Sequence, residues 1–352
     1  MRIVVVGATG NVGTSLVTAL SRDERVGSIV GIARRLPRWT PDKTTWVEAD
    51  ISTDDLAPHF AGADCVVHLA WLIQPSRDMR ALRATNVVGS RNVFDAAARA
   101  GVGSLVYGSS VGAYSPGPKD RPVDETWPTT GVPTSFYSNH KAETESMLDD
   151  FEQANPGVRV VRIRPGLIFK REAASGVRRL FLGPLVPRVA FRKGVVALVP
   201  RHPSLKFQAV HSYDVGEAYR LAVLGDVRGA FNIAAPPVLS SERLAELFDA
   251  RLVPTPGPVL RLLAAAAWRM RLDPTPEGWV DLGLRSPLMD TTRAETVLGW
   301  APRYSSVEAL EELFGGLRDE AGFETPPLSP STGGPFRLKE LATGIGKRSG
   351  VS

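Results

Sequence analysis

The stretch RIVVVGATGNVGTSLVTAL, residues 2–20, limits the fold of this chain more than any other. A β-branched run at residues 3–6 precedes three glycines spaced three residues apart, and apolar residues then recur at helical intervals over 12–20. This order predicts a strand, a tight turn and a helix. A second β-branched run at 28–33 completes a strand–helix–strand unit, which requires parallel strands.

The same alternation continues along the first half of the chain. Apolar runs at 65–69, 104–107 and 158–163 are separated by helical stretches at 79–98 and 136–151. We therefore predict an α/β fold in which a doubly wound parallel sheet carries helices on both faces, as in Rossmann domains.

The glycines of the first turn suit a phosphate-bearing ligand. Gly7 permits the tight turn, Gly10 lets the backbone approach a pyrophosphate, and Gly13 allows close packing of helix on sheet. The helix N-terminus adds unpaired N–H groups. A dinucleotide site is the favoured interpretation, and a turn without a ligand is the alternative.

The chain divides into three parts on this interpretation. We predict a dinucleotide-binding domain over residues 1–170, with segments near 205–235 returning to it, and a mainly substrate-binding lid domain over 171–324. Residues 325–352, rich in Pro, Gly and Ser, predict an extended tail. The helix predicted at 259–272, VLRLLAAAAWRMRL, is expected to be a core-packed or lid helix, with a membrane-surface helix as the alternative.

Composition excludes several classes of function. The net charge of +5 over 352 residues comes without a basic block, so we expect no nucleic-acid partner. Cys65 is the only cysteine and the five histidines show no metal-ligand spacing, so we expect neither a disulfide nor a metal. No apolar window is long enough for a transmembrane segment. A cytoplasmic protein is expected.

Several motifs stand in the order found in one known family. GATGNVG at the first turn resembles the cofactor motif of the extended (atypical) short-chain dehydrogenase/reductase superfamily, of the NAD-dependent epimerase/dehydratase type, whose glycines are spaced GxxGxxG. The resemblance covers residues 1 to about 235, with a weaker echo in LGWAPR at 298–303. Its other landmarks are ADI, HLAW, TNVVGSRNVFDAA, YGSSVGAY, YSNHK and RIRPGLIF.

The resemblance implies a set of residues that contact the dinucleotide. Asn86 would brace the site, or serve only a structural role. The implied cofactor-binding residues are Gly7, Thr9, Gly10, Asn11, Val12, Gly13, Asp50, Ile51, Leu69, Ala70, Trp71, Asn86, Tyr137, Lys141 and Pro165.

The second strand ends without the acidic residue that holds the ribose 2′-hydroxyl of NAD. Ala33 stands there and Arg34 and Arg35 follow. Because arginine can bind a 2′-phosphate in bidentate fashion, Arg34 and Arg35 join the cofactor-binding set and favour NADP(H), with NAD(H) possible. The alternative is that both arginines are solvated loop charges.

YSNHK places Tyr137 and Lys141 one helical turn apart. A nearby ammonium and a positively charged nicotinamide would lower the phenol pKa, so that Tyr137 could exchange a proton with an alcohol or carbonyl. The resemblance assigns the substrate-oxygen role to Ser110, with Ser109 as competitor, and a contact with the nicotinamide ribose to Lys141. We expect His140 to be an ordinary surface histidine.

The residues after the Pro165-Gly166 pair bear on the class of substrate. Relatives that act on nucleotide sugars commonly carry an asparagine soon after the Pro-Gly pair, whereas Leu167 follows Pro165 and Gly166 here. The apolar segment 176–200 suits a lipophilic pocket or lid core. Asp214 is expected to be a helix N-cap.

Three functional hypotheses follow. The first is an NADP(H)-dependent oxidoreductase that reduces a carbonyl or oxidises a secondary alcohol on an apolar small molecule, with Ser110, Tyr137 and Lys141 as catalytic residues. The alternative is a nucleotide-sugar epimerase or dehydratase that retains NAD. A non-enzymatic cofactor-binding sensor is the third. The resemblance makes a homodimer possible.

Overall fold

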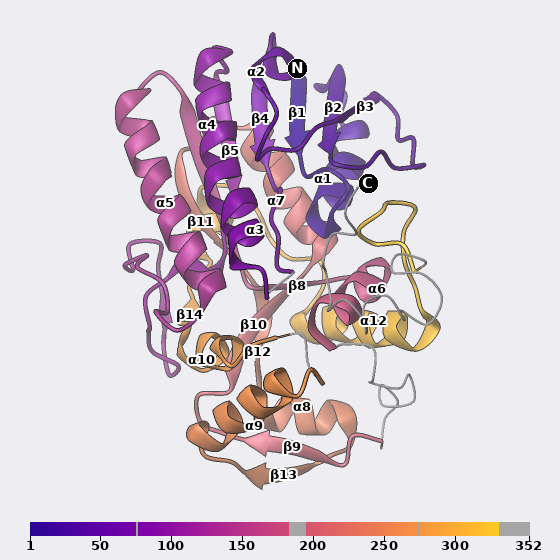
Figure 1. Ribbon diagram of the computed structural model, residues 1–352, viewed down its shortest axis with the longest axis vertical. Coiled ribbons are helices and arrows are strands. Elements are labelled where there is room, and N and C mark those ends of the chain that lie inside the picture. The colour runs from indigo at the N-terminus through magenta and orange to yellow at the C-terminus, as the bar shows by residue number, and fades with distance from the viewer. Residues whose placement is uncertain (75–76, 183–194, 273–274, 331–352) are drawn as a thin grey trace.

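The computed structural model describes residues 1–74, 77–182, 195–272 and 275–330. Its centre is a seven-stranded parallel sheet in the order β11-β7-β5-β4-β1-β2-β3, which confirms the predicted Rossmann-type fold (Figure 1). Its strands are β1 Arg2–Val6, β2 Ser28–Ala33, β3 Thr44–Glu48, β4 Cys65–His68, β5 Ser104–Gly108, β7 Arg159–Pro165 and β11 Gly229–Ile233.

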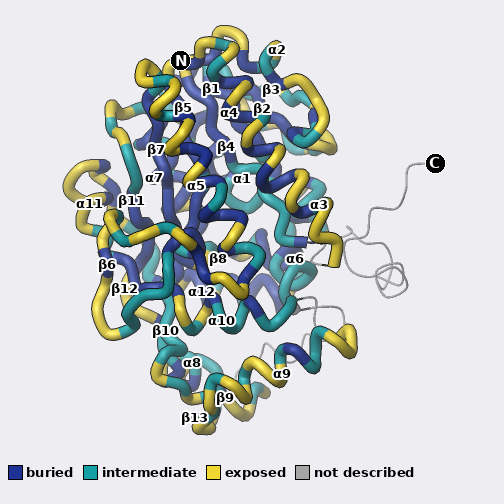
Figure 2. The backbone as a smooth tube through the Cα atoms, turned by 60° about the vertical axis from the view of Figure 1, so that its left-hand side comes forward, coloured by how far each residue is buried: buried dark blue, intermediate teal, exposed yellow. Residues whose placement is uncertain are grey.

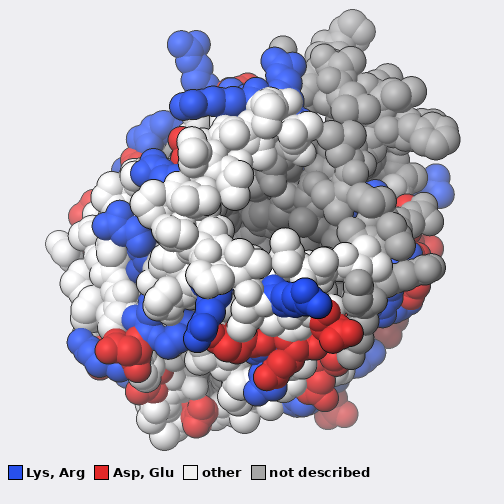
Figure 3. Space-filling view, turned by 90° about the horizontal axis from the view of Figure 1, so that it is seen from below, with Lys and Arg blue, Asp and Glu red and all other residues white. Residues whose placement is uncertain are grey.

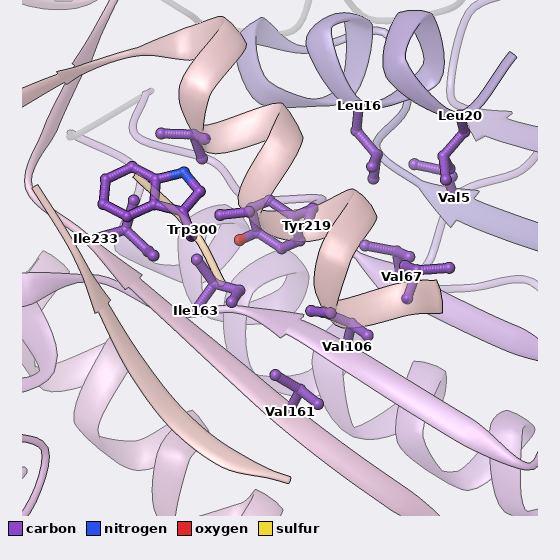
Figure 4. Packing of buried hydrophobic residues seen from close by; sticks show 14 of the residues in the cluster. Val5, Leu16, Leu20, Val67, Val106, Val161, Ile163, Tyr219, Ile233 and Trp300 are labelled. Atoms are coloured by element: carbon purple, nitrogen blue, oxygen red, sulfur yellow. The ribbon is translucent and has the colours of Figure 1, made fainter. Parts of the chain in front are cut away.

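Helices cover both faces of this sheet. On one face, α1 (Asn11–Ser21) and α7 (Ser212–Leu224) bury Leu16, Leu20 and Tyr219 against the strand valines (Figure 4). On the other face, α2 (Ala57–Phe60), α4 (Gly89–Arg99) and α5 (Phe136–Ala154) form a second cluster. Strand residues are buried on both sides, as continuous β-branched runs require.

A second, smaller layer sits beyond the carboxyl ends of the main strands. It contains a three-stranded sheet in the order β12-β10-β8 and two short strand pairs, β13-β9 and β14-β6. Their bounds are β6 Pro122–Val123, β8 Leu167–Phe169, β9 Leu198–Arg201, β10 Lys206–His211, β12 Ala235–Ser240, β13 Arg251–Pro254 and β14 Leu288–Met289. The remaining helices are α3 Met79–Arg83, α6 Ala174–Val177, α8 Ser241–Phe248, α9 Gly257–Arg269, α10 Gly278–Arg285, α11 Thr292–Thr296 and α12 Ser306–Asp319.

The structure differs from the sequence expectations in some details. The helix predicted at 79–98 is interrupted by a π-helical turn at Ala84–Val88. Within 205–235, α7 and β11 join the main sheet layer, whereas β10 pairs with β8 and β12. Trp300 is 1% exposed in the cluster beneath α7, so residues after 290 also pack against the main sheet.

The start of the predicted tail is ordered by specific contacts. Thr325 is 1% exposed and its hydroxyl donates to the Thr9 carbonyl at 2.9 Å. Phe323 contacts Trp39, with ring centroids 5.2 Å apart. Residues 320–330 therefore pack over the first glycine-rich turn, and residues 331–352 lie outside the described part of the chain.

Candidate active site

The glycine-rich turn between β1 and α1 has the steric demands expected of it. Gly7 has φ +85°, and a Cβ there would lie 2.5 Å from the Ala70 backbone nitrogen. A Cβ at Gly13 would lie 2.4 Å from the Gly7 carbonyl oxygen. At Gly10 the nearest described atom would be 3.5 Å away, so protein packing alone leaves space there. No side chain caps α1 at Gly10, which leaves the first-turn N–H groups, including those of Asn11 and Val12, available to an anion.

Lys170 lies behind this turn and was missed by the sequence reasoning. It is 1% exposed, and its Nζ donates to the Asn11 carbonyl at 3.1 Å and to the hydroxyls of Thr14 and Ser15 at 2.8 and 3.0 Å. Burial lowers the pKa of Lys170 to about 8, opposed by Glu172. All three hydrogen-bond acceptors are neutral groups of α1. The sequence near Lys170 does not indicate this role, because its hydrogen-bond partners lie 155 or more residues away along the chain.

The ends of β2 and β3 carry the residues predicted to hold the adenosine half of a dinucleotide. Arg34 and Arg35 are exposed directly after β2. Asp50 is half-buried and its carboxylate accepts the backbone N–H and hydroxyl of Ser52. Ile51 is 4% exposed and packs under Gly89, where a Cβ would lie 2.6 Å from the Ile51 side chain.

The segment after β4 is held by Asn86. This residue is fully buried in the π-helical turn, and its amide accepts the N–H of Leu72 at 2.7 Å and donates to the Leu72 carbonyl at 2.8 Å. Leu69, Ala70 and Trp71, which immediately precede Leu72, are each half-buried. Asn86 therefore ties the π-helical turn to the segment that follows β4.

Ser110 and Tyr137 meet at the carboxyl end of β5. The Ser110 hydroxyl accepts the Gly112 N–H at 3.0 Å. Both the Ser110 hydroxyl and the Tyr137 ring lie beside Gly112, within 3.4 Å of where a Cβ would stand there. Ser109 instead donates to Glu145 at 2.5 Å, which directs it away from Tyr137. A Cβ at Gly112 would lie 2.7 Å from the Tyr137 ring, so the glycine makes room for the phenol.

The protonation of Tyr137 differs from the sequence expectation. Burial raises the pKa of Tyr137, and the neighbouring Ser110 hydroxyl lowers it by less. Lys141 does not offset this because its Nζ donates to the Gly108 carbonyl at 2.6 Å and lies 3.6 Å from the centre of the Trp71 ring. Burial lowers the pKa of Lys141 to about 7, opposed by Glu145.

Glu145 continues the row of Tyr137 and Lys141 along α5. Its carboxylate accepts two hydrogen bonds from Arg164, at 2.8 and 2.9 Å, and both residues are buried. Burial alone would favour the neutral acid, but Arg164 lowers the pKa of Glu145 overall. A carboxylate fixed to β7 in this way holds α5, and hence Tyr137, against the sheet.

An aromatic wall closes the site on the side of the smaller layer. Trp279 of α10 lies with its ring centroid 5.0 Å from that of Tyr137 and 5.2 Å from that of Phe181. Trp71 lies 6.0 Å from Tyr137 on another side. Neither indole nitrogen has a hydrogen-bond partner within the described ranges. A Cβ at Gly278 would lie 2.4 Å from the Thr134 carbonyl, so α10 fits tightly against the entry to α5.

Several other predictions require correction. His140 is 7% exposed, so it is a buried histidine and not a surface one, and burial lowers its pKa. The N-cap of α7 is His211, whereas Asp214 lies inside the helix and accepts the N–H groups of Arg303 and Tyr304 at 3.0 Å each. Pro165 is the last residue of β7. Of the apolar segment 176–200, residues 183–194 lie outside the described residues.

The described residues contain neither a cluster of metal ligands nor a membrane-spanning helix. Among them, no group of His, Cys, Asp or Glu has the arrangement of a metal site. The helices within the described ranges are all too short or too polar to cross a membrane.

Sequence comparison defines the class to which this fold and site belong. The pattern of the NAD dependent epimerase/dehydratase family matches residues 3–234, which is more than half of the chain. The chain therefore belongs to this family, as the motif order predicted.

Individual proteins that match this chain have low sequence identity to it, between 28% and 30% for those named below. An uncharacterized protein of Mycobacterium tuberculosis is 29% identical over 344 residues, which are 97% of this chain and 32% of that protein. The chain thus spans about a third of the length of the first curated relatives it matches. A 3-beta-hydroxysteroid dehydrogenase of Mycolicibacterium neoaurum is 30% identical over 53% of each chain. A decarboxylating sterol-4-alpha-carboxylate 3-dehydrogenase of Saccharomyces cerevisiae is 28% identical over 51% of this chain and 55% of that protein.

Solved structures share the fold. A structure of MoeE5 with UDP-glucuronic acid and NAD has a TM-score of 0.67 at 20% identity, covering 91% of this chain and 100% of the other. The UDP-glucose 4-epimerase of Thermotoga maritima, solved with UDP-glucose, has a TM-score of 0.66 at 20% identity, covering 91% and 99%.

Proposed function

We propose that this protein is a nicotinamide-dependent oxidoreductase that interconverts a ketone and a secondary alcohol on an apolar, ring-containing small molecule. The observation that carries the proposal is the position of the Tyr137 phenol, which lies near Ser110 and next to the rings of Trp71 and Trp279. A site walled by indole rings favours an apolar substrate over a sugar diphosphate. Two partial relatives named for steroid and sterol dehydrogenation agree with this substrate class.

The turn at residues 7–13 would hold the dinucleotide. The open space at Gly10, the uncapped start of α1 and the buried ammonium of Lys170 together fit a diphosphate. When bound, the nicotinamide supplies the hydride or takes it up. Asp50 and Ile51 would contact the adenine and Pro165 the nicotinamide side, as the family resemblance implies.

The chain's own groups would manage the proton. In the reductive direction, Tyr137 gives its hydroxyl proton to the carbonyl oxygen while hydride is added to the carbonyl carbon, which leaves the alcohol and a phenolate. Ser110 donates its hydroxyl hydrogen to the same oxygen, while its own oxygen accepts the Gly112 N–H. Because burial raises the pKa of Tyr137, the phenol carries its proton near neutral pH, which suits reduction.

Arg34 and Arg35 favour NADP(H) as the cofactor. Both are exposed just after β2, where a 2′-phosphate would lie. The last residue of β2 is Ala33, so no acidic side chain stands there to repel a phosphate. The test is to measure Kd for NADP(H) and NAD(H) with the intact protein and with Arg34→Ala and Arg35→Ala. We expect NADP(H) to bind more tightly to the intact chain and each variant to lose about tenfold of that preference. Tighter binding of NAD(H) by the intact chain would overturn the preference.

The reaction itself is tested by absorbance at about 340 nm, the band of reduced nicotinamide. We expect consumption of reduced cofactor with cyclic ketones of steroid-like shape, and none with nucleotide sugars. We also propose that α4 and α5 form the interface of a homodimer, as in relatives of this family, which sedimentation velocity would test.

The second candidate is a nucleotide-sugar epimerase or dehydratase that retains NAD. The likeness of the whole fold to two UDP-sugar complexes favours it. It requires a diphosphate-binding group after Pro165, whereas the side chain there is Leu167, 43% exposed. Purified protein that carries tightly bound NAD and converts a nucleotide sugar without net absorbance change would establish this candidate and exclude the first.

A further inference from the structure

Helix α9 turns its apolar side outward. Val259, Leu262, Leu263 and Met270 are 43%, 67%, 61% and 63% exposed, whereas Ala265 on the opposite side is 8% exposed. These four exposed positions share one face at helical spacing. Helices of globular proteins normally turn their large apolar side chains to the core, whereas these four side chains of α9 point outward. We call Val259, Leu262, Leu263, Met270 and the following Leu272 the α9 surface.

The surface lies at one end of the molecule. Figures 1 and 2 show α9 beside β9 and β13 at the end remote from the N-terminus, with much of its length exposed. The two neighbouring strands add exposed apolar side chains to the same lobe, since Leu198 is 60% and Val253 39% exposed. An exposed apolar area of this extent on a single lobe indicates an interaction site.

The charged residues of the α9 segment itself are all basic. Residues 257–272 include Arg261, Arg269 and Arg271 and contain no Asp or Glu. Arg77, from another part of the chain, lies over the Trp268 ring at 3.5 Å. Within the described residues only Arg261 among these four has an ion-pair partner, Asp281 at 3.5 Å. Figure 3, which views this end of the molecule, shows an uncharged surface with scattered basic side chains, while the acidic ones gather along one side.

The sign of these charges selects the partner. A second copy docked by the same face would bring each set of arginines near its own symmetry mate, which is repulsive. The chain's own residues 331–352 are an equally poor match, because they contain Arg337, Lys339, Lys347 and Arg348 against a single Glu340. A lipid surface offers phosphates for the arginines directly above acyl chains for the leucines.

We propose that the α9 surface docks this protein on an anionic lipid bilayer. The apolar side chains of α9 enter the boundary of headgroups and acyl chains, about 5–10 Å deep, and Arg269 and Arg271 contact lipid phosphates. The lobe that docks also carries Trp279, which contacts Tyr137. An apolar molecule dissolved in the bilayer would therefore meet the protein on the side of the aromatic wall. The docking goes beyond the proposed reaction and does not depend on it.

The experiment measures binding of the full chain to vesicles by co-sedimentation, without cofactor or substrate. The vesicles are phosphatidylcholine alone, or phosphatidylcholine with a minority of phosphatidylglycerol. The variants are Leu262→Glu with Leu263→Glu, the milder Leu262→Ser with Leu263→Ser, and Arg269→Gln with Arg271→Gln. The matched control is Val297→Glu, which alters an exposed valine at the end of α11, away from α9. Circular dichroism and dinucleotide titration establish that each variant is folded.

The intact chain and Val297→Glu are expected to bind the anionic vesicles. The leucine variants should lower the partition coefficient by about tenfold or more, because two large apolar side chains are lost from the interface. The arginine variant should bind both vesicle types equally weakly. The proposal is overturned if the intact chain does not sediment with anionic vesicles, or if the folded serine variant binds them as well as the control. It is also overturned if the leucine changes only convert a dimer to a monomer in sedimentation velocity.

Discussion

Trp279 and Tyr137 face each other with ring centroids 5.0 Å apart, although one begins α10 of the smaller layer and the other begins α5 of the main sheet. This pair joins the group proposed to move the proton to the wall proposed to select the substrate. Neither position could be connected to the other by sequence pattern, since the contact depends on how the two layers pack.

Trp279→Ala is expected to raise KM for an apolar ketone about tenfold or more, with a smaller effect on kcat. The indole contributes apolar contact area to the substrate but does not take part in proton transfer. Trp279→Phe retains a ring at this position and should keep most of the affinity. Steady-state kinetics of the two variants check this expectation, and an alanine variant that loses kcat with KM unchanged would speak against a substrate wall.

Asn86→Leu is expected to destabilise the fold by roughly 2–4 kcal/mol, since both polar groups of the Leu72 backbone lose their partner in a buried place. Urea unfolding measures the change in free energy. Asn139→Ala provides the comparison, because that asparagine is exposed on α5 and its side chain donates to the Pro133 carbonyl. An equal loss of unfolding free energy in the two variants would show that the Asn86 hydrogen bonds to Leu72 do not stabilise the fold.

Lys170 should make dinucleotide binding depend on pH. Its folded-state pKa is about 8, and the anionic diphosphate favours its protonated form, so the contribution is present below pH 8 and is lost as the pH rises through this value. Lys170→Met should weaken dinucleotide binding about tenfold at neutral pH, with a smaller difference in alkaline buffer.

The control for this effect is Lys119→Met. Lys119 is half-buried, and burial lowers its pKa to about 8, but it donates to the Lys206 and Gly283 carbonyls. Titration calorimetry across pH compares the two variants. If both shift the dinucleotide Kd equally, the effect is general destabilisation and not a charge beside the turn.

Much of the architecture could be predicted from local pattern. The strand–turn–helix at residues 2–20 carries its own signal, because Gly7 and Gly13 stand where any side chain would strike backbone. The later alternation of apolar runs and helical stretches predicted the parallel sheet, and the family resemblance of the later motifs placed Ser110 and Tyr137 in one site. These features are encoded within short stretches of chain.

Contacts between distant segments could not be predicted in this way. Lys170, Glu145 and Trp279 reach the site through packing, and nothing in their neighbouring residues marks them. The π turn that contains Asn86 has the sequence pattern of an ordinary helix. His140 has polar neighbours in sequence, yet it is buried in the fold. Burial of Tyr137 and Lys141 also moved their pKa values in directions that spacing alone did not indicate.

The central claim is that the Tyr137 phenol transfers the proton to and from the substrate oxygen. The most direct measurement is single-turnover reduction of a cyclic ketone by Tyr137→Phe loaded with reduced cofactor, beside the intact protein. If Tyr137 transfers the proton, we expect the single-turnover rate of Tyr137→Phe to be lower by about a hundredfold or more, with dinucleotide Kd and thermal stability nearly unchanged. A variant that reduces the ketone within a few-fold of the intact rate would contradict it.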